Sequence, residues 1–305
     1  MILTSYYYPF QEDFLLNGIS GTTGYFFKKD GDIFADIPTW FLSHEQKNEI
    51  FRKLTIIQMP QRPEKLKLPN SKITALLDRA KEKLFFNPSP LPTQAFPKIK
   101  SNFILPDRIP FRKFQTLIQE AYQKGFFVFK IKLRPQNLIK LKNILSTFPY
   151  ENFPKIQFRF DGNQSLNYDD LKNFISVIPK ERIDYIEDPF AKEQDKKIWI
   201  ENQKVQLAAD ESFLKQFYAT GSAEEAISNI PEEILIVKPS WIGANFLVYQ
   251  LVKVARKLKK RVIFTSVFES PYGIYDLQKL ALEFRPDEVH GLSLNIFQDD
   301  FAEQA

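Results

Sequence analysis

The stretch FFVFKIKLR, residues 126–134, decides the fold because it has the pattern of a strand that carries charge on one face. Successive side chains of a strand point to opposite faces of the sheet. The odd-numbered residues from Phe127 to Leu133 are all apolar, whereas Lys130 and Lys132 lie on the even-numbered face. If the apolar face packs on helices, the two lysines point into the space that the sheet encloses.

Strand-like segments recur along the rest of the chain, and amphipathic helical segments separate them. The expected strands are residues 101–105, 126–133, 155–161, 183–188, 205–210, 233–238, 261–268 and 291–297. One intervening helix is expected over residues 110–125, with Gly125 as its stop. Eight strands with helices between them predict an α/β fold, a parallel (β/α) barrel.

A polar or charged residue stands near the C-terminal end of six consecutive expected strands. The residues are Lys132, Asp161, Glu187, Asp210, Lys238 and Ser266, at intervals of 29, 26, 23, 28 and 28 positions. Each interval is about one βα unit, and barrel enzymes place their active sites at this end of the strands. We therefore expect these side chains to surround one cavity. Parity adds Arg159 to the inner face with Asp161, and Ile183 and Tyr185 to the inner face with Glu187.

The first third of the chain has a different pattern. Residues 1–95 hold short strand-like pieces and a helix start at Ser43, where Gln46 is placed for a capping box. The segment PSPLPTQAFP, residues 88–97, has four prolines and indicates a domain junction. The predicted domains are an α+β cap over residues 1–95, completed by the tail 298–305, and a barrel over residues 96–297.

Composition narrows the chemistry. The chain has no cysteine and two histidines, His44 and His290, so thiolate catalysis and multi-histidine metal sites are excluded. A Ser-His-Asp triad would have to use one of those two histidines. Acid–base work then falls to lysines and carboxylates, and a bound metal would have oxygen ligands, which suits Mg²⁺ or Mn²⁺.

Neither a nucleic acid nor a membrane is an expected partner. The net charge is +5, and the densest basic run, RKLKKR at residues 256–261, suits the solvated C-terminal end of a helix. No aromatic–basic motif accompanies this run. No apolar stretch reaches the length of a membrane span, and the N-terminus lacks the pattern of a signal peptide. The cytoplasm is the simplest expected location, and the sequence leaves the oligomeric state open.

The inward-facing charges suggest a reaction. Asp161, Glu187 and Asp210 come from adjacent strands and supply three anionic oxygens for one hard cation. A Mg²⁺ ion beside lysines lowers their pKa, so that one of them can act as a base near neutral pH. The metal would accept the charge of the enediolate formed when a proton leaves the carbon next to a carboxylate.

At this point the sequence resembles a known family. The motifs FKIKL, RFDGN, YIEDP, AADES and IVKPS are similar to those of the enolase superfamily, in its muconate-lactonizing subgroup. Within that subgroup, RFDGNQSL, VKPSWIGA and SVFESPYGIYDLQKLA most resemble the o-succinylbenzoate synthases. The resemblance covers roughly residues 125 to 295. The subgroup shares these motifs, so they do not by themselves fix one reaction.

The resemblance implies an enolase-type barrel with a capping domain, a small carboxylate substrate and a role for each matching residue. The implied reaction is the syn dehydration of 2-succinyl-6-hydroxy-2,4-cyclohexadiene-1-carboxylate to o-succinylbenzoate, a step toward menaquinone. Asp161, Glu187 and Asp210 would bind Mg²⁺, with Mn²⁺ as a substitute. Lys132 would act as base and Lys238 as the cation across the ring. The implied substrate-binding residues are Lys130, Arg159, Asn163, Thr265, Ser266 and Gly291.

Departures from the family pattern leave three alternatives open. Residues 31–41, GDIFADIPTWF, replace the glycine-rich capping loop of the family and are bulkier, so substrate contacts cannot be assigned to them. Asp188 stands where the family often has glutamate, on the opposite parity from the metal face, so little is expected of it. A dipeptide epimerase would need an acidic pair in residues 291–297, which have none. An N-acylamino acid racemase could use the same lysines, and a non-catalytic protein that binds through its basic surface is the third alternative.

Overall fold

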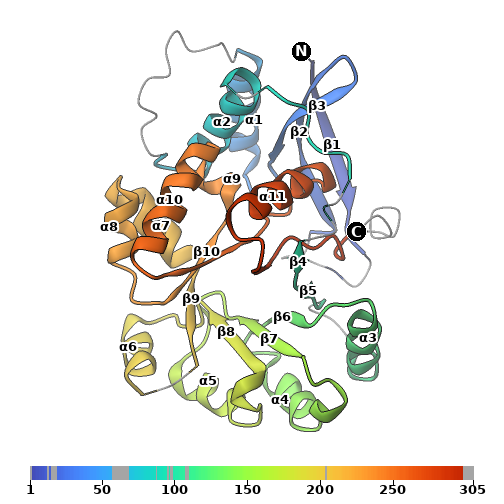
Figure 1. The fold of residues 1–305 in the computed structure, drawn as a ribbon, viewed down its shortest axis with the longest axis vertical. Helices are drawn as coiled ribbons and strands as arrows, with labels where there is room; N and C mark the ends of the chain where they lie inside the picture. Colours follow the sequence, from blue (N-terminus) through green and yellow to red (C-terminus); the bar gives the residue numbers. More distant parts are fainter. Residues whose placement is uncertain are drawn as a thin grey trace.

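The computed structural model describes residues 2–11, 14, 19–56, 69–86, 88–94, 96, 99–106, 110–202 and 205–297. Figure 1 shows two parts, an antiparallel sheet with helices at one end and a curled parallel sheet surrounded by helices at the other. The predicted tail 298–305 lies outside the described residues, and the predicted domain boundaries stay a prediction. No helix among the described residues combines the length and the apolar character that a membrane crossing requires.

The N-terminal part is a three-stranded antiparallel sheet covered by helices. Its elements are β1 (Ile2–Pro9), β2 (Gly21–Lys29), β3 (Asp32–Pro38), α1 (His44–Thr55), α2 (Lys72–Lys81) and a π-helical turn, η1 (Glu82–Phe86). The predicted capping box is confirmed, since Ser43 Oγ accepts from the Gln46 backbone N–H at 3.2 Å and Gln46 Oε1 accepts from the Ser43 N–H at 3.0 Å. A small core between sheet and helices, including Phe27, Ile37 and Leu76, holds this cap together.

The larger part is a parallel sheet of seven strands in chain order. The strands are β5 (Phe103–Ile104), β6 (Val128–Lys132), β7 (Gln157–Asp161), β8 (Ile183–Glu187), β9 (Leu207–Ala209), β10 (Ile234–Val237) and β11 (Arg261–Phe264). The intervening helices are α3 (Phe111–Gln123), α4 (Leu138–Ser146), α5 (Tyr168–Ile175), α6 (Glu193–Asn202), α7 (Glu211–Thr220), α8 (Ala223–Ser228), α9 (Pro239–Ile242), α10 (Asn245–Lys257) and α11 (Pro271–Phe284). Two short 3₁₀ turns also lie in this part, η2 (Tyr150–Asn152) and η3 (Lys180–Arg182).

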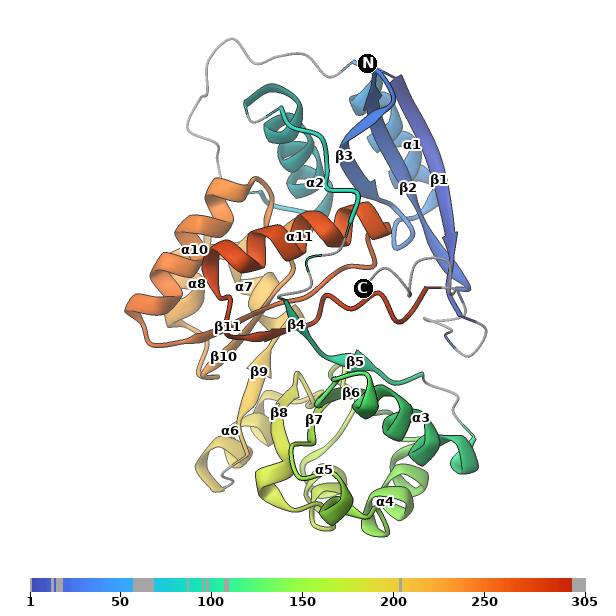
Figure 2. The same cartoon turned by 45° about the vertical axis from the view of Figure 1, so that its right-hand side comes forward.

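A short pairing joins the two ends of the curled sheet. β12 (Val289–His290) pairs in parallel with β4 (Lys100–Ser101), which leads directly into β5. On its other side, Gly291 forms a parallel bridge with Thr265, which follows β11. The expected strand over residues 291–297 is therefore wrong, because the paired residues are two positions earlier and the chain beyond Gly291 leaves the sheet. Figure 2 shows β4, β11 and the C-terminal segment side by side at this closure.

Side chains sort onto the two faces of the sheet mostly as parity predicts. Phe129 and Ile131 pack outward against helices, whereas Tyr185 and Ile236 form a small cluster inside the barrel. Ile183 is the exception, because it packs in the outer core. The register between β7 and β8 shifts next to Phe158, and the added residue reverses the parity of Ile183 relative to the rest of β8.

Buried charges clamp the cap to the barrel. Asp276 on α11 accepts from Arg79 of α2, with an Nη2–Oδ2 distance of 2.8 Å, and from Lys83 of the π turn. All three side chains are almost fully buried. Burial raises the pKa of Asp276, but Lys83 and Arg79 outweigh it and hold that pKa below its ordinary value.

We expect Asp276→Asn to lower the free energy of unfolding by about 3–5 kcal/mol, because it leaves two buried cations without their shared counter-ion. Denaturant unfolding checks this value. Glu283→Gln, on the exposed side of the same helix, is the control and should change stability by less than about 1 kcal/mol. Equal effects of the two substitutions would contradict the clamp.

Candidate active site

A cavity of about 890 Å³ opens between the cap and the C-terminal ends of the barrel strands. Ten of the eleven site residues predicted from the sequence line it: Lys130, Lys132, Asp161, Asn163, Glu187, Asp210, Lys238, Thr265, Ser266 and Gly291. Arg159 is not among the lining residues. The cavity has the size of a small-molecule site.

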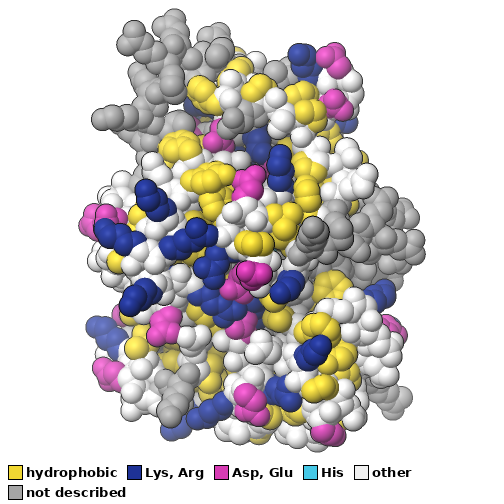
Figure 3. Space-filling view, viewed as in Figure 1, with side chains coloured by type: hydrophobic (Ala, Val, Ile, Leu, Met, Phe, Trp, Pro, Cys, Tyr) yellow, Lys and Arg dark blue, Asp and Glu magenta, His cyan; other side chains and the backbone are white. Residues whose placement is uncertain are grey.

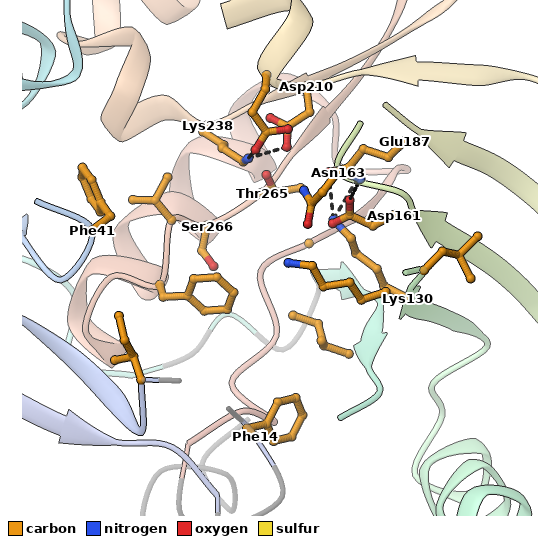
Figure 4. A pocket seen from close by; sticks show the side chains of 18 of the residues that line it. Phe14, Phe41, Lys130, Asp161, Asn163, Glu187, Asp210, Lys238, Thr265 and Ser266 are labelled. Carbon is orange, nitrogen blue, oxygen red and sulfur yellow. Dashed lines mark hydrogen bonds and ion pairs between the residues drawn. The ribbon is translucent and has the colours of Figure 1, made fainter. Parts of the chain in front are cut away.

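Parallel pairing places the charged groups at one level. Lys132 is in register with Asp161, and Asp161 is in register with Glu187 on the next strand. Asp210 directly follows β9 and begins α7. Figure 4 shows the carboxylates of Asp161, Glu187 and Asp210 facing the cavity from three successive strands.

Two lysines hold these carboxylates from opposite sides. Lys130 Nζ lies 3.0 Å from Asp161 Oδ2 and 2.8 Å from Glu187 Oε2. Lys238 Nζ donates to Asp210 and lies 3.2 Å from Glu211 Oε1. The carboxylates of the site are therefore divided between two ammonium groups.

Burial and charge shift these groups in opposite directions. Burial raises the pKa of Asp210 well above its ordinary range, against the attraction of Lys238 and with the help of Glu211 and Glu187. Burial also raises the pKa of Glu187, despite Lys130. Burial is thus the main reason why negative charge on these two carboxylates is unfavourable, and the lysines offset only part of that cost.

Asp161 and the lysines show the opposite balance. Burial would raise the pKa of Asp161, but Lys130 and Lys132 together hold it below its ordinary value. Burial would lower the pKa of Lys130, but Asp161 and Glu187 raise it well above the ordinary value. The pKa of Lys238 is likewise raised, by Asp210 and Glu211 against burial.

Lys132 differs from the other two lysines. Its ammonium has no ion-pair partner within 4 Å among the described residues. Its positive charge nevertheless helps to lower the pKa of Asp161. Asn137 holds the strand end in place, since its Nδ2 donates to the Lys132 carbonyl at 2.9 Å. Of the three lysines carried by the barrel strands at the cavity, Lys132 is thus the one whose Nζ forms no ion pair with a described carboxylate.

The carboxylates of the cavity can be compared with the ligands that a divalent cation requires. Over the described part of the chain, no group of three or more Asp, Glu or His side chains is arranged around a metal position. Lys130 and Lys238 lie among the carboxylates in this structure. The chemistry nevertheless fits a hard cation, since three buried carboxylates meet at one edge and two of them have raised pKa values. The residues that would hold it are Asp161, Glu187 and Asp210.

Asp188 has a positioning role that parity did not indicate. Its carboxylate accepts from the backbone N–H of Asp210 at 3.2 Å, and from the N–H and Oγ of Ser212 at 2.9 and 2.6 Å. Asp188 thereby fixes the turn that presents the Asp210 side chain. The expectation that little depends on Asp188 was wrong, because a side chain on the far face can still accept hydrogen bonds from the backbone at the start of α7.

Arg159 lies inside the barrel beneath the cavity. It is fully buried, its Nε donates to Asp184 Oδ2 at 2.7 Å, and its guanidinium stacks on Tyr185 with 4.9 Å between Cζ and the ring centroid. Its Nη1 also donates to Asn102 Oδ1 at 3.3 Å. This position supports the floor of the cavity, and the predicted contact of Arg159 with substrate stays a prediction.

The floor and roof of the cavity include residues that the sequence did not single out. Asn102 is buried and lines the floor, where its Nδ2 has no partner among the described residues. Trp40 and Phe41 of the cap line the roof, and Trp40 Nε1 donates to the carbonyl of Val267 at 2.6 Å. Part of the bulky 31–41 stretch thus faces the cavity, while most of it forms strand β3.

A buried carboxylate secures the loop after β11. Glu269 accepts from Ser240 Oγ at 2.6 Å and from the Val267 N–H at 2.8 Å. Burial, with a contribution from Asp36, raises the pKa of Glu269 to about 7. The folded protein therefore binds this proton more tightly than the unfolded chain does.

Stability is expected to depend on pH through Glu269. Its contribution is present below pH 4.5, the ordinary pKa, and is lost as the pH rises to about 7. The loss amounts to roughly 3 kcal/mol. Denaturant unfolding between pH 4.5 and 8 measures it, and Glu269→Gln, which cannot ionise, should flatten that part of the profile. A profile unchanged by the substitution would contradict this assignment.

The basic run at residues 256–261 is engaged in internal contacts. Lys257 pairs with Glu224 at 3.0 Å, and Lys260 donates to the carbonyl oxygens of Ile230 and Glu232. Arg261 pairs with Asp184 and Glu288. Figure 3 shows basic and acidic side chains interspersed on the side of α8 and α10. These contacts give Lys257, Lys260 and Arg261 of the run a structural role.

Solved structures define the class of fold. The chain is 15% identical to an o-succinylbenzoate synthase from Thermosynechococcus elongatus BP-1, described as complexed with Mg in the active site, with a TM-score of 0.68 and coverage of 95% of this chain and 91% of that one. The L-Ala-D/L-Glu epimerase from Bacillus subtilis gives a TM-score of 0.74 at 13% identity, with coverage of 98% and 90%. The muconate lactonizing enzyme from Pseudomonas putida gives 0.69 at 14%, with coverage of 98% and 89%. The chain has the enolase-type fold, a barrel of α/β class under an N-terminal sheet, as predicted.

Curated relatives add a resemblance in sequence. The chain is 25% identical to the o-succinylbenzoate synthase of Vibrio cholerae serotype O1 (strain M66-2) over 172 residues, which are 55% of this chain and 51% of that protein. It is 26% identical to that of Escherichia coli O6:K15:H31 (strain 536 / UPEC) over 186 residues, or 60% and 56%. The matches span about half the length of these relatives, and no model of a known protein family matches the chain. The predicted resemblance to the o-succinylbenzoate synthases is confirmed.

Proposed function

We propose that this chain is a Mg²⁺-dependent lyase that dehydrates 2-succinyl-6-hydroxy-2,4-cyclohexadiene-1-carboxylate to o-succinylbenzoate, through an enediolate. The carrying observation is the placement of Lys132 and Lys238 in one cavity with the carboxylates of Asp161, Glu187 and Asp210. The sequence relatives support the choice of reaction, since the curated proteins are o-succinylbenzoate synthases. In this reading the product is an intermediate on the way to menaquinone.

Lys132 is the proposed base and acid. Its Nζ takes the proton from the ring carbon that bears the carboxylate, and the electron pair of that C–H bond moves toward the carboxylate to form the enediolate. When the enediolate collapses, this electron pair forms the new ring double bond as the neighbouring C–O bond breaks. The leaving hydroxide takes the proton back from Lys132 and departs as water. In a syn elimination both groups leave from one face, so a single lysine can serve both steps.

Lys238 and Lys130 are proposed to act by charge. Lys238 lies on the Asp210 side of the cavity, with its Nζ 4.8 Å from the centroid of the Trp241 ring. From there it would face the π system of the substrate ring as a cation. Lys130, between Asp161 and Glu187, would donate a hydrogen bond to the substrate carboxylate. Both cations favour the extra negative charge that builds up as the proton leaves.

Asp161, Glu187 and Asp210 are the proposed ligands of the metal. A bound Mg²⁺ supplies positive charge next to the carboxylate oxygens on which electrons accumulate. The raised pKa values of Glu187 and Asp210 support the assignment, because burial makes their negative charge unfavourable and a bound cation would offset that cost. Mn²⁺ as a substitute stays a prediction.

A racemase is the second candidate, because the solved structures with this fold include epimerases. Two lysines on opposite sides of an acidic carbon could exchange its proton from either face. The dipeptide epimerase alternative is less favoured, since residues 291–297 contain no acidic side chain to hold a substrate ammonium group.

Direct assay separates the two candidates. The purified chain with Mg²⁺ should convert the cyclohexadiene substrate to o-succinylbenzoate, which is followed by the absorbance of the aromatic product. In a parallel assay, an N-succinylamino acid in deuterated water should show little exchange of its α-proton. Exchange without dehydration would replace the proposed function by the racemase.

A further inference from the structure

Lys72 is a cation on the cap side of the cavity that the proposed mechanism does not use. It is the first residue of α2, directly after the N-cap Ser71, and its half-buried side chain lines the cavity. Its Nζ lies 3.5 Å from the centroid of the Trp241 ring and 5.6 Å from that of Phe41. Aromatic faces thus hold the ammonium at the cavity wall.

Three features disfavour a cation at this place. The N-terminal end of a helix is positive, so a lysine in the first turn of α2 is unfavourable there. Lys238 also lies near the same Trp241 ring, at 4.8 Å, so the two ammonium groups are at most about 8 Å apart. Burial, and then Lys238, lower the pKa of Lys72.

Glu211 and Asp210 attract the Lys72 ammonium from a distance, but burial and Lys238 outweigh them. Lys72 forms no ion pair in the described part of the chain, and the nearby acids Asp210 and Glu211 both pair with Lys238. An apolar side chain could pack against the same aromatic rings without the free-energy cost of burying a charge. A cation kept at a site that disfavours it is typical of a binding residue.

We propose that Lys72 forms a subsite for a second anionic group, the distal carboxylate of a dianionic substrate. The first carboxylate would lie at Asp161, Glu187 and Asp210, and the arm would extend across the cavity toward the cap. This inference rests on the proposed function for the identity of the substrate, whose succinyl arm ends in such a carboxylate. Lys72 would then select dicarboxylates without touching the reacting carbon.

Binding measurements test the subsite apart from turnover. The probes are o-succinylbenzoate and 2-butyrylbenzoate, in which a methyl group replaces the distal carboxylate, titrated calorimetrically into the full chain with Mg²⁺. The wild type should prefer the dicarboxylate by on the order of 10- to 100-fold, the range of a charge-assisted hydrogen bond. Lys72→Met should lose most of this preference, and Lys72→Arg should keep most of it.

Two controls separate recognition from packing. Lys155 is exposed and lies 5.2 Å from the Phe127 ring outside the cavity, so Lys155→Met should leave the preference unchanged. Lys72→Met should keep the melting temperature or raise it slightly, since it removes a cation from a helix start. An unchanged preference in Lys72→Met, or no preference in the wild type, would overturn the subsite, and a lowered melting temperature with unchanged preference would show that Lys72 serves the packing of Trp241.

Kinetics distinguish failure of the subsite from failure of the proposed function. If both hold, Lys72→Met raises KM by a similar factor and leaves kcat nearly unchanged, because the residue contributes to binding alone. A wild type that prefers o-succinylbenzoate in calorimetry but does not form it from the cyclohexadiene substrate would keep the subsite and reject the reaction. A wild type that dehydrates, with KM unaffected by Lys72→Met, would keep the reaction and reject the subsite.

Discussion

Lys132→Ala is expected to lower the rate of dehydration by at least about 10²–10⁴-fold, the usual contribution of a general base. The loss should be larger still, because the same Nζ is proposed to return the proton to the leaving hydroxide. Lys132→Arg should be no better, since a guanidinium stays protonated and cannot accept a proton. Single-turnover formation of o-succinylbenzoate measures the chemical step directly.

Substitutions of Lys238 separate the two candidate reactions. If Lys238 acts only as a cation, Lys238→Arg should retain more dehydration than Lys238→Ala. In a racemase both lysines exchange protons, so Lys238→Arg should be as inactive as Lys132→Ala. Exchange of the α-proton in deuterated water is measured on the same variants. A Lys132→Ala protein that dehydrates its substrate at close to the wild-type rate would refute the mechanism.

Asp210→Asn is expected to remove most of the affinity for Mg²⁺ and nearly all activity. The substitution takes away one of three anionic ligands from a site for a hard cation. Calorimetric titration with Mg²⁺ measures the affinity independently of turnover. The matched control is Asp169→Asn, an exposed carboxylate on α5 outside the cavity, which should change neither quantity.

Removal of the metal tests the same site without a mutation. Chelation should abolish dehydration, and addition of Mg²⁺ should restore it. Full activity in excess EDTA would rule out the metal assignment. Retention of wild-type Mg²⁺ affinity by Asp210→Asn would move the ligand set away from this carboxylate.

Much of the barrel was predictable from the sequence because parity and spacing are local properties of a strand. Lys132, Asp161 and Glu187 lie in register as their spacing indicates. Ile183 was misplaced because a register shift depends on the partner strand and leaves no mark in the sequence of β8. The positioning contact of Asp188 was missed because it too depends on a distant segment, since its partners lie at the start of α7.

Residues 291–297 show a second reason why a sequence pattern can mispredict a strand. Leu292, Leu294 and Ile296 alternate with less apolar residues, which indicated a strand. All three are buried in the core of the barrel's C-terminal half, yet beyond Gly291 the described segment forms only an isolated antiparallel bridge, between Phe297 and Phe10. The alternating pattern correctly indicated which side chains are buried. It did not indicate strand pairing, because the parallel pairing with the barrel sheet ends at Gly291. The cap residues at the cavity were not predictable, because the place where one domain meets another depends on tertiary packing.

The closure of the sheet also has a consequence for how the chain folds. The pair Lys100–Val289 joins residues 189 positions apart, and its two strands have two residues each. Such a contact carries a large loop-closure entropy and few hydrogen bonds, so we expect it to form after the neighbouring βα units. Until then β5 and β11 are open edges, which can pair with other chains. Refolding yield should therefore fall as protein concentration rises, through association of chains whose ring has not yet closed.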